Sequence, residues 1–360
     1  MGRRGALVRV SMVVAIALAA SACTTTHPTR AFRMPGAEPS AAQWKTWVLT
    51  SPADVTVPPP PAPGSAEAIA DTRELEDAVA LRTPSALDAM AAWDGAGEPI
   101  SGPWMRMAFE LVSARAPDPP AASRAYALLA VAAYDAMVAT WYWKYRYQRA
   151  APDVVEKASP SGADPSYPSE HAAIAGAAAK VLAYLFPERP ARVVSDAAIE
   201  AATSRVLAGA NWPSDTTAGL VLGDEVGAKV VAYAEADGAA RPCTKEAPGG
   251  RPQFWAPPTG VAGAPVQPCA GEWRPWVLES GSQFRPEPPP VFGDGAFEDQ
   301  AYQAIGVKRD LTPEQKRTAT YWAGGAGTAQ AAGIWNDIAI GYIRTRLPTE
   351  PQSERVLALA

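Results

Sequence analysis

The sequence predicts an all-α protein. Apolar residues recur at helical spacing through most of the chain between residues 66 and 238, and no convincing run of alternating β-branched residues appears. Prolines and glycines divide this pattern into segments of helix length. With 360 residues and 48% apolar content, the chain can bury a sizeable core. We therefore expect a helical bundle.

The N-terminal segment, residues 1–23, has the features of a secretory signal. Three arginines precede an apolar stretch over residues 10–20, and the sequence SAC ends at Cys23. The apolar stretch is too short for a stable membrane span. Small residues directly before a cysteine are typical of a bacterial lipoprotein, so we expect lipidation of Cys23. Ordinary signal cleavage nearby is the alternative.

The charge of the processed chain excludes one class of partner. The net charge is -5, and loss of the three signal arginines makes it -8, with 29 basic against 37 acidic residues. A surface this acidic argues against binding to nucleic acid. No other stretch of the sequence is long and apolar enough to cross a bilayer. We expect an exported protein on the periplasmic side of the cell envelope, in contact with the membrane only through its N-terminal lipid anchor.

Residues 24–65 have the composition of a linker. They are rich in Pro, Ser, Thr and Ala and end in the sequence VPPPPAPGSAEA. Such a composition predicts a flexible, proline-rich tether between the lipid and the globular part.

Residues 66–238 are expected to form the helical domain. Its predicted helices cover about residues 66–82, 104–115, 122–147, 169–188, 190–210 and 213–238. In the last of these, Gly219, Gly223 and Gly227 recur every four residues, which leaves one helix face nearly bare. A neighbouring helix can therefore approach that face closely.

Residues 239–298 form a long irregular segment rich in proline and tryptophan. We expect this segment to wrap over the bundle and to be fixed there by its aromatic side chains. It contains Cys243 and Cys269, for which a disulfide is expected in an exported protein. Two free buried thiols are the alternative. His171 is the only histidine within the folded region, so no direct metal site is expected.

Residues 299–360 contain the start of an internal repeat. Aligned without gaps, the segment from Trp104 to Leu128 and the segment from Trp335 to Leu359 are identical at eight of 25 positions. We interpret residues 299–360 as helices that begin a second, incomplete repeat. Two unrelated amphipathic helices joined by a proline turn are the alternative. Without a partner, the last helix is expected to expose apolar surface.

Three short stretches carry candidate functional side chains. The first ends one helix, the second opens the next, and the third joins the end of a further helix to the start of another. The candidates are Lys144 and Arg149, then Ser169 and His171, then Ser204, Arg205, Asn211 and Asp215. Lysine and arginine neutralise an oxyanion, a helix N-terminus offers free N–H groups, and a histidine can transfer a proton. Together these residue types favour an oxyanion pocket.

The three stretches resemble the motifs of the type 2 phosphatidic acid phosphatase and vanadium-dependent haloperoxidase superfamily. Those motifs read Lys-x6-Arg-Pro, Pro-Ser-Gly-His and Ser-Arg-x5-His-x3-Asp. The resemblance runs from about residue 93 to residue 238 and continues through RPWVLESGSQFRPEPPP, which is similar to a loop of the bacterial haloperoxidase-like branch. It implies a helical bundle of the acid phosphatase and haloperoxidase type. It also implies a small phosphate ester or oxyanion as partner, and no cofactor other than vanadate.

The resemblance also implies a role for each motif residue. Phosphate or vanadate oxygens would be bound by Lys144, Ser169, Ser204 and Arg205. His171 would be the acid or base, and Asp215 would orient the nucleophilic histidine of the third motif. An active member would be a phosphatase, acting on phosphoric monoesters, or a haloperoxidase-like oxidant.

The sequence departs from each motif at one position. Ala151 stands at the arginine position of the first motif, although Arg149 could substitute for it. Glu170 replaces the glycine of the second motif and brings a carboxylate to an anion site, which opposes binding. Asn211 stands where the nucleophilic histidine belongs, so the usual covalent route is lost.

Three interpretations follow from these departures. The chain is an exported enzyme with an unorthodox pocket, a non-catalytic lipid-tethered helical protein, or a truncated product of a two-unit enzyme. Each motif residue also has a purely structural explanation. Serine, asparagine, proline and aspartate are typical of helix starts, as at Ser169 and around Asn211, and basic residues are typical of helix ends, as at Lys144.

Overall fold

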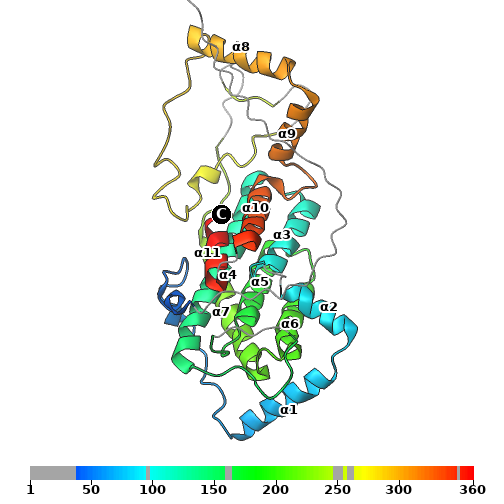
Figure 1. Ribbon diagram of the computed structural model, residues 1–360. Coiled ribbons are helices and arrows are strands. Elements are labelled where there is room, and N and C mark those ends of the chain that lie inside the picture. The colour runs from blue at the N-terminus through cyan, green and yellow to red at the C-terminus, as the bar shows by residue number, and fades with distance from the viewer. Residues whose placement is uncertain (1–37, 95–97, 159–163, 246–253, 258–262, 347–348) are drawn as a thin grey trace, which may run out of the picture. The chain divides into compact units, whose positions relative to one another are not determined.

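The structure is a computed structural model that describes residues 38–94, 98–158, 164–245, 254–257, 263–346 and 349–360. In these residues it contains eleven α-helices and no β-strand (Figure 1), which confirms the predicted all-α class. The predicted signal, Cys23 and the first part of the predicted tether lie outside the described residues. None of the described helices is long and apolar enough to cross a membrane.

Four helices build the core of the bundle. They are α4 (Pro119–Tyr147), α5 (Glu170–Leu185), α6 (Ala191–Leu207) and α7 (Pro213–Ala236). The longest, α4, begins where the Asp118 side chain accepts the N–H of Ala121 at 2.9 Å, and it ends at Gln148 in the left-handed conformation. Nineteen of its residues are buried, and helices α3, α5, α7, α10 and α11 pack on it.

Helices α5 and α7 are in direct backbone contact. A Cβ atom at Gly223 would meet the carbonyl oxygen of Ala173 and would lie 2.9 Å from the N atom of Ala177. In the other direction, a Cβ atom at Gly176 would lie 2.6 Å from the carbonyl oxygen of Leu220. The regularly spaced glycines of α7 thus allow close approach of a neighbouring helix, as predicted. Only residues without a side chain permit so small a distance between the backbones of α5 and α7.

Three helices lie before the core. They are α1 (Ala66–Ala80), α2 (Pro84–Trp93) and α3 (Gly102–Arg115). Sequence analysis predicted α1 and α3 but not α2, which is short. Thr83 caps α2 by accepting the N–H of Ala86 at 3.2 Å, and Pro84 fixes its first turn. Both α1 and α2 pack against α6.

The chain is not a free tether over residues 38–57 of the predicted tether at 24–65, because this part packs on the bundle. Two 3-10 helices, η1 (Pro39–Gln43) and η2 (Pro52–Asp54), pack on α4. Between them the buried carboxylate of Asp135 accepts the backbone N–H groups of Trp47, Val48 and Leu49 at 2.8, 2.8 and 3.0 Å. The composition resembled a linker, but a buried acid on α4 organises this backbone and holds it against the bundle.

The proline- and tryptophan-rich segment contacts the bundle through the ring of Trp276 and through hydrogen bonds from Arg274 and Gln267. The ring of Trp276 stacks on Tyr233 of α7 at 4.4 Å and meets Trp47 edge-on at 6.3 Å. A disulfide joins Cys243 to Cys269 and closes the loop before Trp276. The described residues from Val277 to Asp294 are almost all exposed, so the predicted wrapping is local rather than continuous.

The last four helices are α8 (Gly295–Arg309), α9 (Pro313–Ala323), α10 (Gln330–Arg346) and α11 (Glu350–Leu359). Their boundaries follow the internal repeat. Arg115, which ends α3, is aligned with Arg346, which ends α10, and the first residues of α4 and α11 are aligned in the same way. The expectation of an unpartnered last helix is corrected, because α11 packs on α4 and buries Leu357 and Glu354.

Replacement of Gly223 by alanine is expected to lower the free energy of unfolding by about 3 kcal/mol, because the new methyl group collides with backbone that cannot move without separating α5 from α7. Gly306→Ala in α8 is the control, since nothing lies within 4 Å of its Cβ position. The control is expected to gain about 0.5–1 kcal/mol from helix propensity. Urea unfolding of both variants measures the difference. Equal stability of the two variants would contradict the close packing of α5 on α7.

Candidate active site

The structure brings the three motif stretches together. They lie at the C-terminal end of α4, the N-terminal end of α5, the C-terminal end of α6 and the N-terminal end of α7. Seven of the eight predicted site residues are buried, namely Lys144, Ser169, His171, Ser204, Arg205, Asn211 and Asp215. The eighth, Arg149, has a side chain that is 13% exposed. The arrangement is therefore a site built from four helix ends, as the motifs imply.

Lys144 is paired with a carboxylate of the second motif. Its Nζ lies 2.8 Å from Oε2 of Glu170 and also donates a hydrogen bond to the carbonyl oxygen of Pro165. Burial raises the pKa of Glu170. The positive charge of Lys144 and the hydrogen bond with His171 lower this pKa by more than burial raises it, so the net shift is downward. Glu170 is thus an ionised, resident anion beside the motif lysine.

His171 lies next to the same carboxylate. Its Nδ1 is 3.4 Å from Oε1 of Glu170. Burial lowers the pKa of His171, and the charge of Arg205 lowers it further, although Glu170 opposes both. At neutral pH the imidazole is therefore uncharged and could accept a proton, but its closest ionic neighbour is a carboxylate of the protein.

Arg149 does not face an open anion site. Its guanidinium donates to Oδ1 of Asp215 at 2.7 Å, to Oγ of Ser214 at 2.7 Å and to Oδ2 of Asp71 at 2.8 Å. Trp212 and Tyr167 cover it, with ring centroids at 5.3 and 6.0 Å. In the structure Arg149 ties α1 to the start of α7, and its role as the substitute motif arginine stays a prediction.

Asp215 has its expected place but a different partner. With Asn211 in the third motif there is no histidine to orient, and Asp215 instead accepts the N–H of Trp212 at 2.9 Å besides pairing with Arg149. Burial raises the pKa of Asp215 to about 6, against the lowering effect of Arg149. The carboxylate closes the first turn of α7, which is the structural alternative that the sequence left open.

Ser204 and Arg205, the first two residues of the third motif, also have hydrogen-bond partners within the protein. Arg205 donates to Oδ1 of Asp94 at 2.7 Å, and Ser204 donates to the carbonyl oxygen of Ala201 in its own helix at 2.7 Å. Ser204 is thus hydrogen-bonded within α6, and its role at an anion stays a prediction.

Asn211 and Ser169 connect the start of α5 to the loop before α7. The Asn211 amide donates to the carbonyl oxygen of Ser166 at 3.0 Å, and Oγ of Ser169 lies 3.4 Å from Oδ1 of Asn211. Ser169 is also the N-cap of α5, and its backbone N–H donates to the carbonyl oxygen of Asp215 at 2.9 Å. The asparagine therefore acts here as a hydrogen-bond donor to the backbone.

Glu350, the first residue of α11, interacts electrostatically with Glu170 and Lys144 of the site, which the sequence did not predict. Its side chain is half-buried. Burial and, to a smaller extent, the negative charge of Glu170 raise the pKa of Glu350 to about 8, although the positive charges of Lys144 and Arg205 lower it. One turn later, Glu354 is fully buried and accepts the N–H of Ser101 at 3.0 Å. Burial raises the pKa of Glu354 to about 7. Two acidic residues of the second repeat, Glu350 and Glu354, thus interact with residues of the first repeat unit.

The cations of the site are paired with carboxylates of the protein itself. Each motif cation has a carboxylate partner at 2.7 or 2.8 Å: Lys144 with Glu170, Arg149 with Asp215 and Asp71, and Arg205 with Asp94. Vanadate does not fit this residue set, because its cationic ligands are neutralised and Asn211 stands at the position of the bonding histidine. Among the described residues no group of three His, Cys, Asp or Glu side chains could hold a metal ion.

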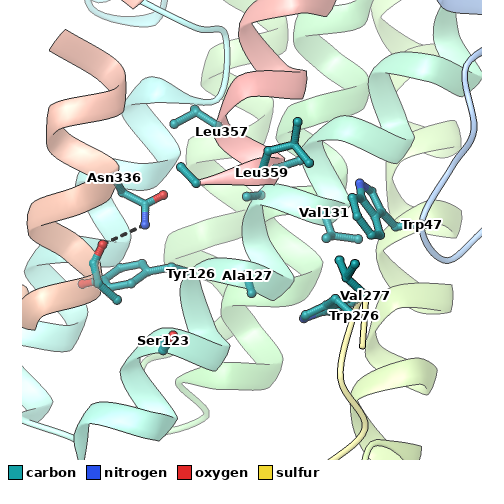
Figure 2. A pocket seen from close by; sticks show the side chains of 14 residues that line it. Trp47, Ser123, Tyr126, Ala127, Val131, Trp276, Val277, Asn336, Leu357 and Leu359 are labelled. Atoms are coloured by element: carbon teal, nitrogen blue, oxygen red, sulfur yellow. Dashed lines mark hydrogen bonds between the residues drawn. The ribbon is translucent and has the colours of Figure 1, made fainter. Parts of the chain in front are cut away.

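A separate cavity of about 240 Å³ lies between α4, α10 and α11 (Figure 2). Its walls are mainly apolar, from Val131 of α4 and Leu357 and Leu359 of α11, and Trp47 and Trp276 stand at one side. No motif residue lines this cavity. The motif residues therefore lie outside it, packed among their own ion pairs.

The family comparison agrees with the fold and the motif order. Residues 124–235, which run from α4 to α7, match the family model of the PAP2 superfamily. This segment contains the three motif stretches, so the match agrees with the resemblance that they carry. No curated protein matches the chain.

Three solved structures are similar to this chain in fold. The first is a bacterial vanadium-dependent iodoperoxidase, with 24% identity, a TM-score of 0.47 and coverage of 55% of this chain and 57% of that one. The second is a transmembrane PAP2 type phosphatidylglycerolphosphate phosphatase from Bacillus subtilis, with 19% identity, a TM-score of 0.41 and coverage of 50% and 91%. The third is a bacterial vanadium-dependent chloroperoxidase, with 14% identity, a TM-score of 0.42 and coverage of 55% of both chains. The chain thus spans little more than half of either peroxidase.

The buried acids of α11 predict a pH-dependent stability. Because the folded-state pKa of Glu354 is raised from 4.5 to about 7, the folded protein binds more protons than the unfolded chain between these values. The free energy of unfolding should therefore fall as the pH rises from about 4.5 to about 7, by about 2–3 kcal/mol from this group. Glu350 acts in the same direction up to a pH of about 8.

Glu354→Gln tests this prediction, because the amide can still accept the N–H of Ser101 and cannot ionise. Urea unfolding at several pH values between 5 and 8 should show a flatter dependence for this variant than for the unsubstituted protein. Glu298→Gln, at an exposed position of α8, is the control and should leave the dependence unchanged. Parallel curves for all three proteins would contradict the buried position of Glu354.

Proposed function

We propose that this chain is an exported, non-catalytic relative of the PAP2 phosphatases and haloperoxidases, whose oxyanion pocket is filled by its own carboxylates. The observation that supports this most strongly is the 2.8 Å ion pair between Lys144 and Glu170. A phosphate or vanadate ion at Lys144 would have to displace Glu170 or lie beside it. Both are unfavourable, because the first leaves a buried carboxylate without its partner and the second places two anions together.

The chemistry of Asn211 supports the same proposal. A phosphoenzyme needs a nucleophile with an available lone pair, and the amide nitrogen of asparagine has none because its lone pair is delocalised. In addition, that nitrogen donates to the carbonyl oxygen of Ser166. His171 retains a position in which it could transfer a proton, but the covalent route also needs a side chain that attacks phosphorus, and Asn211 cannot do so.

We further propose that Cys23 carries a lipid that anchors the protein on the periplasmic side of the cell envelope, with no other membrane contact. The signal-like residues 1–23 support this location. The disulfide between Cys243 and Cys269 is compatible with it, since disulfides persist in oxidising compartments. In a bacterial host, Cys23→Ser should move the protein from the membrane fraction to a fraction without lipid. Retention in the membrane fraction would argue against the anchor.

Titration of the purified protein with orthovanadate and with inorganic phosphate tests the central proposal. Calorimetry should detect no saturable binding at millimolar concentrations, and p-nitrophenyl phosphate should not be hydrolysed. The double variant Glu170→Gly, Asn211→His removes the resident anion and restores an imidazole. It should bind vanadate, because Lys144 and Arg205 then lie beside an unfilled position.

The single variant Asn211→His is the matched control. It restores the imidazole but keeps Glu170 on Lys144, so we expect it to bind vanadate at least tenfold more weakly than the double variant, if binding is measurable at all. Hydrolysis of p-nitrophenyl phosphate by the unsubstituted protein that is lost in His171→Ala would overturn the non-catalytic assignment and favour an enzyme with an unorthodox pocket.

A further inference from the structure

Residues 39–64, which include the backbone held by Asp135, have a counterpart later in the chain. Aligned without gaps, residues 39–64 and 268–293 are identical at 11 of 26 positions. Both contain the sequence Trp-Val-Leu, and a tryptophan followed by a basic residue comes shortly before it in both. We refer to residues 44–49 as the first WVL segment and to residues 273–278 as the second WVL segment. The counterpart extends the internal repeat to residues that precede α3 and α10.

The first WVL segment lies in a site on α4 that recognises its backbone. The carboxylate of Asp135, which is 0% exposed, accepts the N–H groups of residues 47–49 at 2.8, 2.8 and 3.0 Å. The adjacent hydroxyl of Tyr134 donates to the carbonyl oxygen of Lys45 at 3.0 Å. Leu49 is the apolar anchor of the segment and is only 4% exposed. Because four of these contacts go to the backbone, the site selects a chain conformation and one leucine rather than a long sequence.

The second WVL segment begins with the conformation that the first one has in this site. A 3-10 helix precedes each segment, η1 in the first case and η4 (Ala270–Glu272) in the second. The residue that ends this helix has φ -70° and ψ 148° at Trp44, and φ -65° and ψ 148° at Trp273. In both cases its N–H donates to the carbonyl oxygen three residues earlier. The start of the second segment is therefore already ordered as in the bound first segment, which lowers the entropy cost of binding.

The second WVL segment also lies next to this site. The ring of Trp276 meets the ring of Trp47 edge-on, with the centroids 6.3 Å apart. Val277 lines the same cavity as Trp47 and Val131 of α4 (Figure 2). Val131 precedes Asp135 by four residues and therefore lies one helical turn away on the same side of α4. The two segments are thus neighbours on one helix.

We propose that this site on α4 binds extended peptides of the type Trp-Lys/Arg-x-Trp-Val-Leu, and that the second WVL segment is an alternative ligand that exchanges with the first. In the exchanged state the N–H groups of residues 276–278 bind the Asp135 carboxylate, and Leu278 takes the place of Leu49. The first WVL segment is then released from α4. The two repeat units thus compete for one site of the first unit.

The positions at which the two segments differ are compatible with exchange. Pro275 stands at the place of Thr46 and has no N–H, but the carboxylate on α4 uses only the N–H groups of residues 47–49. Farther along, Phe284 stands at the place of the fully buried Val55 and is too large for that position. The second segment therefore matches only the half of the first that Asp135 holds. This difference favours the first segment, which is the one bound in the structure.

Synthetic peptides added to the full chain test the exchange. The double variant Val48→Pro, Leu49→Ala removes one N–H donor and the apolar anchor of the first segment and leaves α4 unchanged, so that the site is open to a peptide. A fluorescein-labelled peptide of residues 270–280 should bind this open variant about tenfold more tightly than the unsubstituted protein, as measured by fluorescence anisotropy. The peptide of residues 41–51, from the first segment, is the positive control.

Two further substitutions distinguish this site from unspecific binding. Asp135→Asn in the open variant should weaken binding of the 270–280 peptide about tenfold, because an amide N–H₂ replaces an oxygen that accepts N–H groups. Glu225→Gln, at an exposed position of α7, removes the same charge and should leave the affinity unchanged. Val277→Pro in the peptide removes an N–H and should weaken binding as much as Asp135→Asn does.

Hydrogen exchange tests the same proposal on the unsubstituted protein and does not depend on the open variant. The 270–280 peptide should accelerate exchange of the N–H groups of residues 47–49, because it occupies the site whenever the first segment leaves it. The acceleration should reach about sixfold at about five times the Kd of the peptide, by mass action.

Unchanged exchange at about 1 mM peptide would overturn the proposal, since a concentration this high is comparable to that of a tethered segment. Binding of the 41–51 peptide alone would overturn it as well and would assign the second segment to another acceptor. Binding that neither Asp135→Asn nor Val277→Pro weakens would show that the peptide adheres elsewhere, which would also contradict the proposal.

Discussion

The ion pair between Lys144 and Glu170 decides the character of the site. A lysine at the end of α4 would ordinarily be the cation of an oxyanion pocket, and here the first residue of α5 provides the anion from within the protein. Because the pair is buried, removal of one partner leaves the other without compensation. The remaining cations follow the same rule, since Arg149 and Arg205 are also held by aspartates. Each of the three cations thus has a carboxylate partner within the protein.

This arrangement depends on the contact between α5 and α7. Glycines in both helices allow their backbones to touch, and this contact brings the start of α5 to the start of α7. Ser169, Glu170 and His171 are fixed by that position, and a hydrogen bond from the Ser169 N–H to the Asp215 carbonyl oxygen joins the two helix starts at 2.9 Å. The backbone contact between α5 and α7 therefore fixes the place where the second and third motif stretches meet.

The sequence predicted what depends on local periodicity. Long amphipathic or alanine-rich patterns located α4, α5 and α7, and the motif order located the four helix ends. It did not predict partners that are distant along the chain, such as Asp71 for Arg149, Asp94 for Arg205 and Glu350 beside Glu170. The backbone that Asp135 organises was missed for the same reason, since 86 to 88 residues separate these groups. Composition alone cannot distinguish such a segment from a free linker.

A crystal structure of the protein grown in the presence of orthovanadate would test the central claim most directly. The account predicts that the Glu170 carboxylate remains within hydrogen-bonding distance of Lys144 Nζ and that no anion lies between Lys144, Ser169 and Arg205. Vanadate bound at that position, with the Glu170 side chain turned away from Lys144, would contradict it.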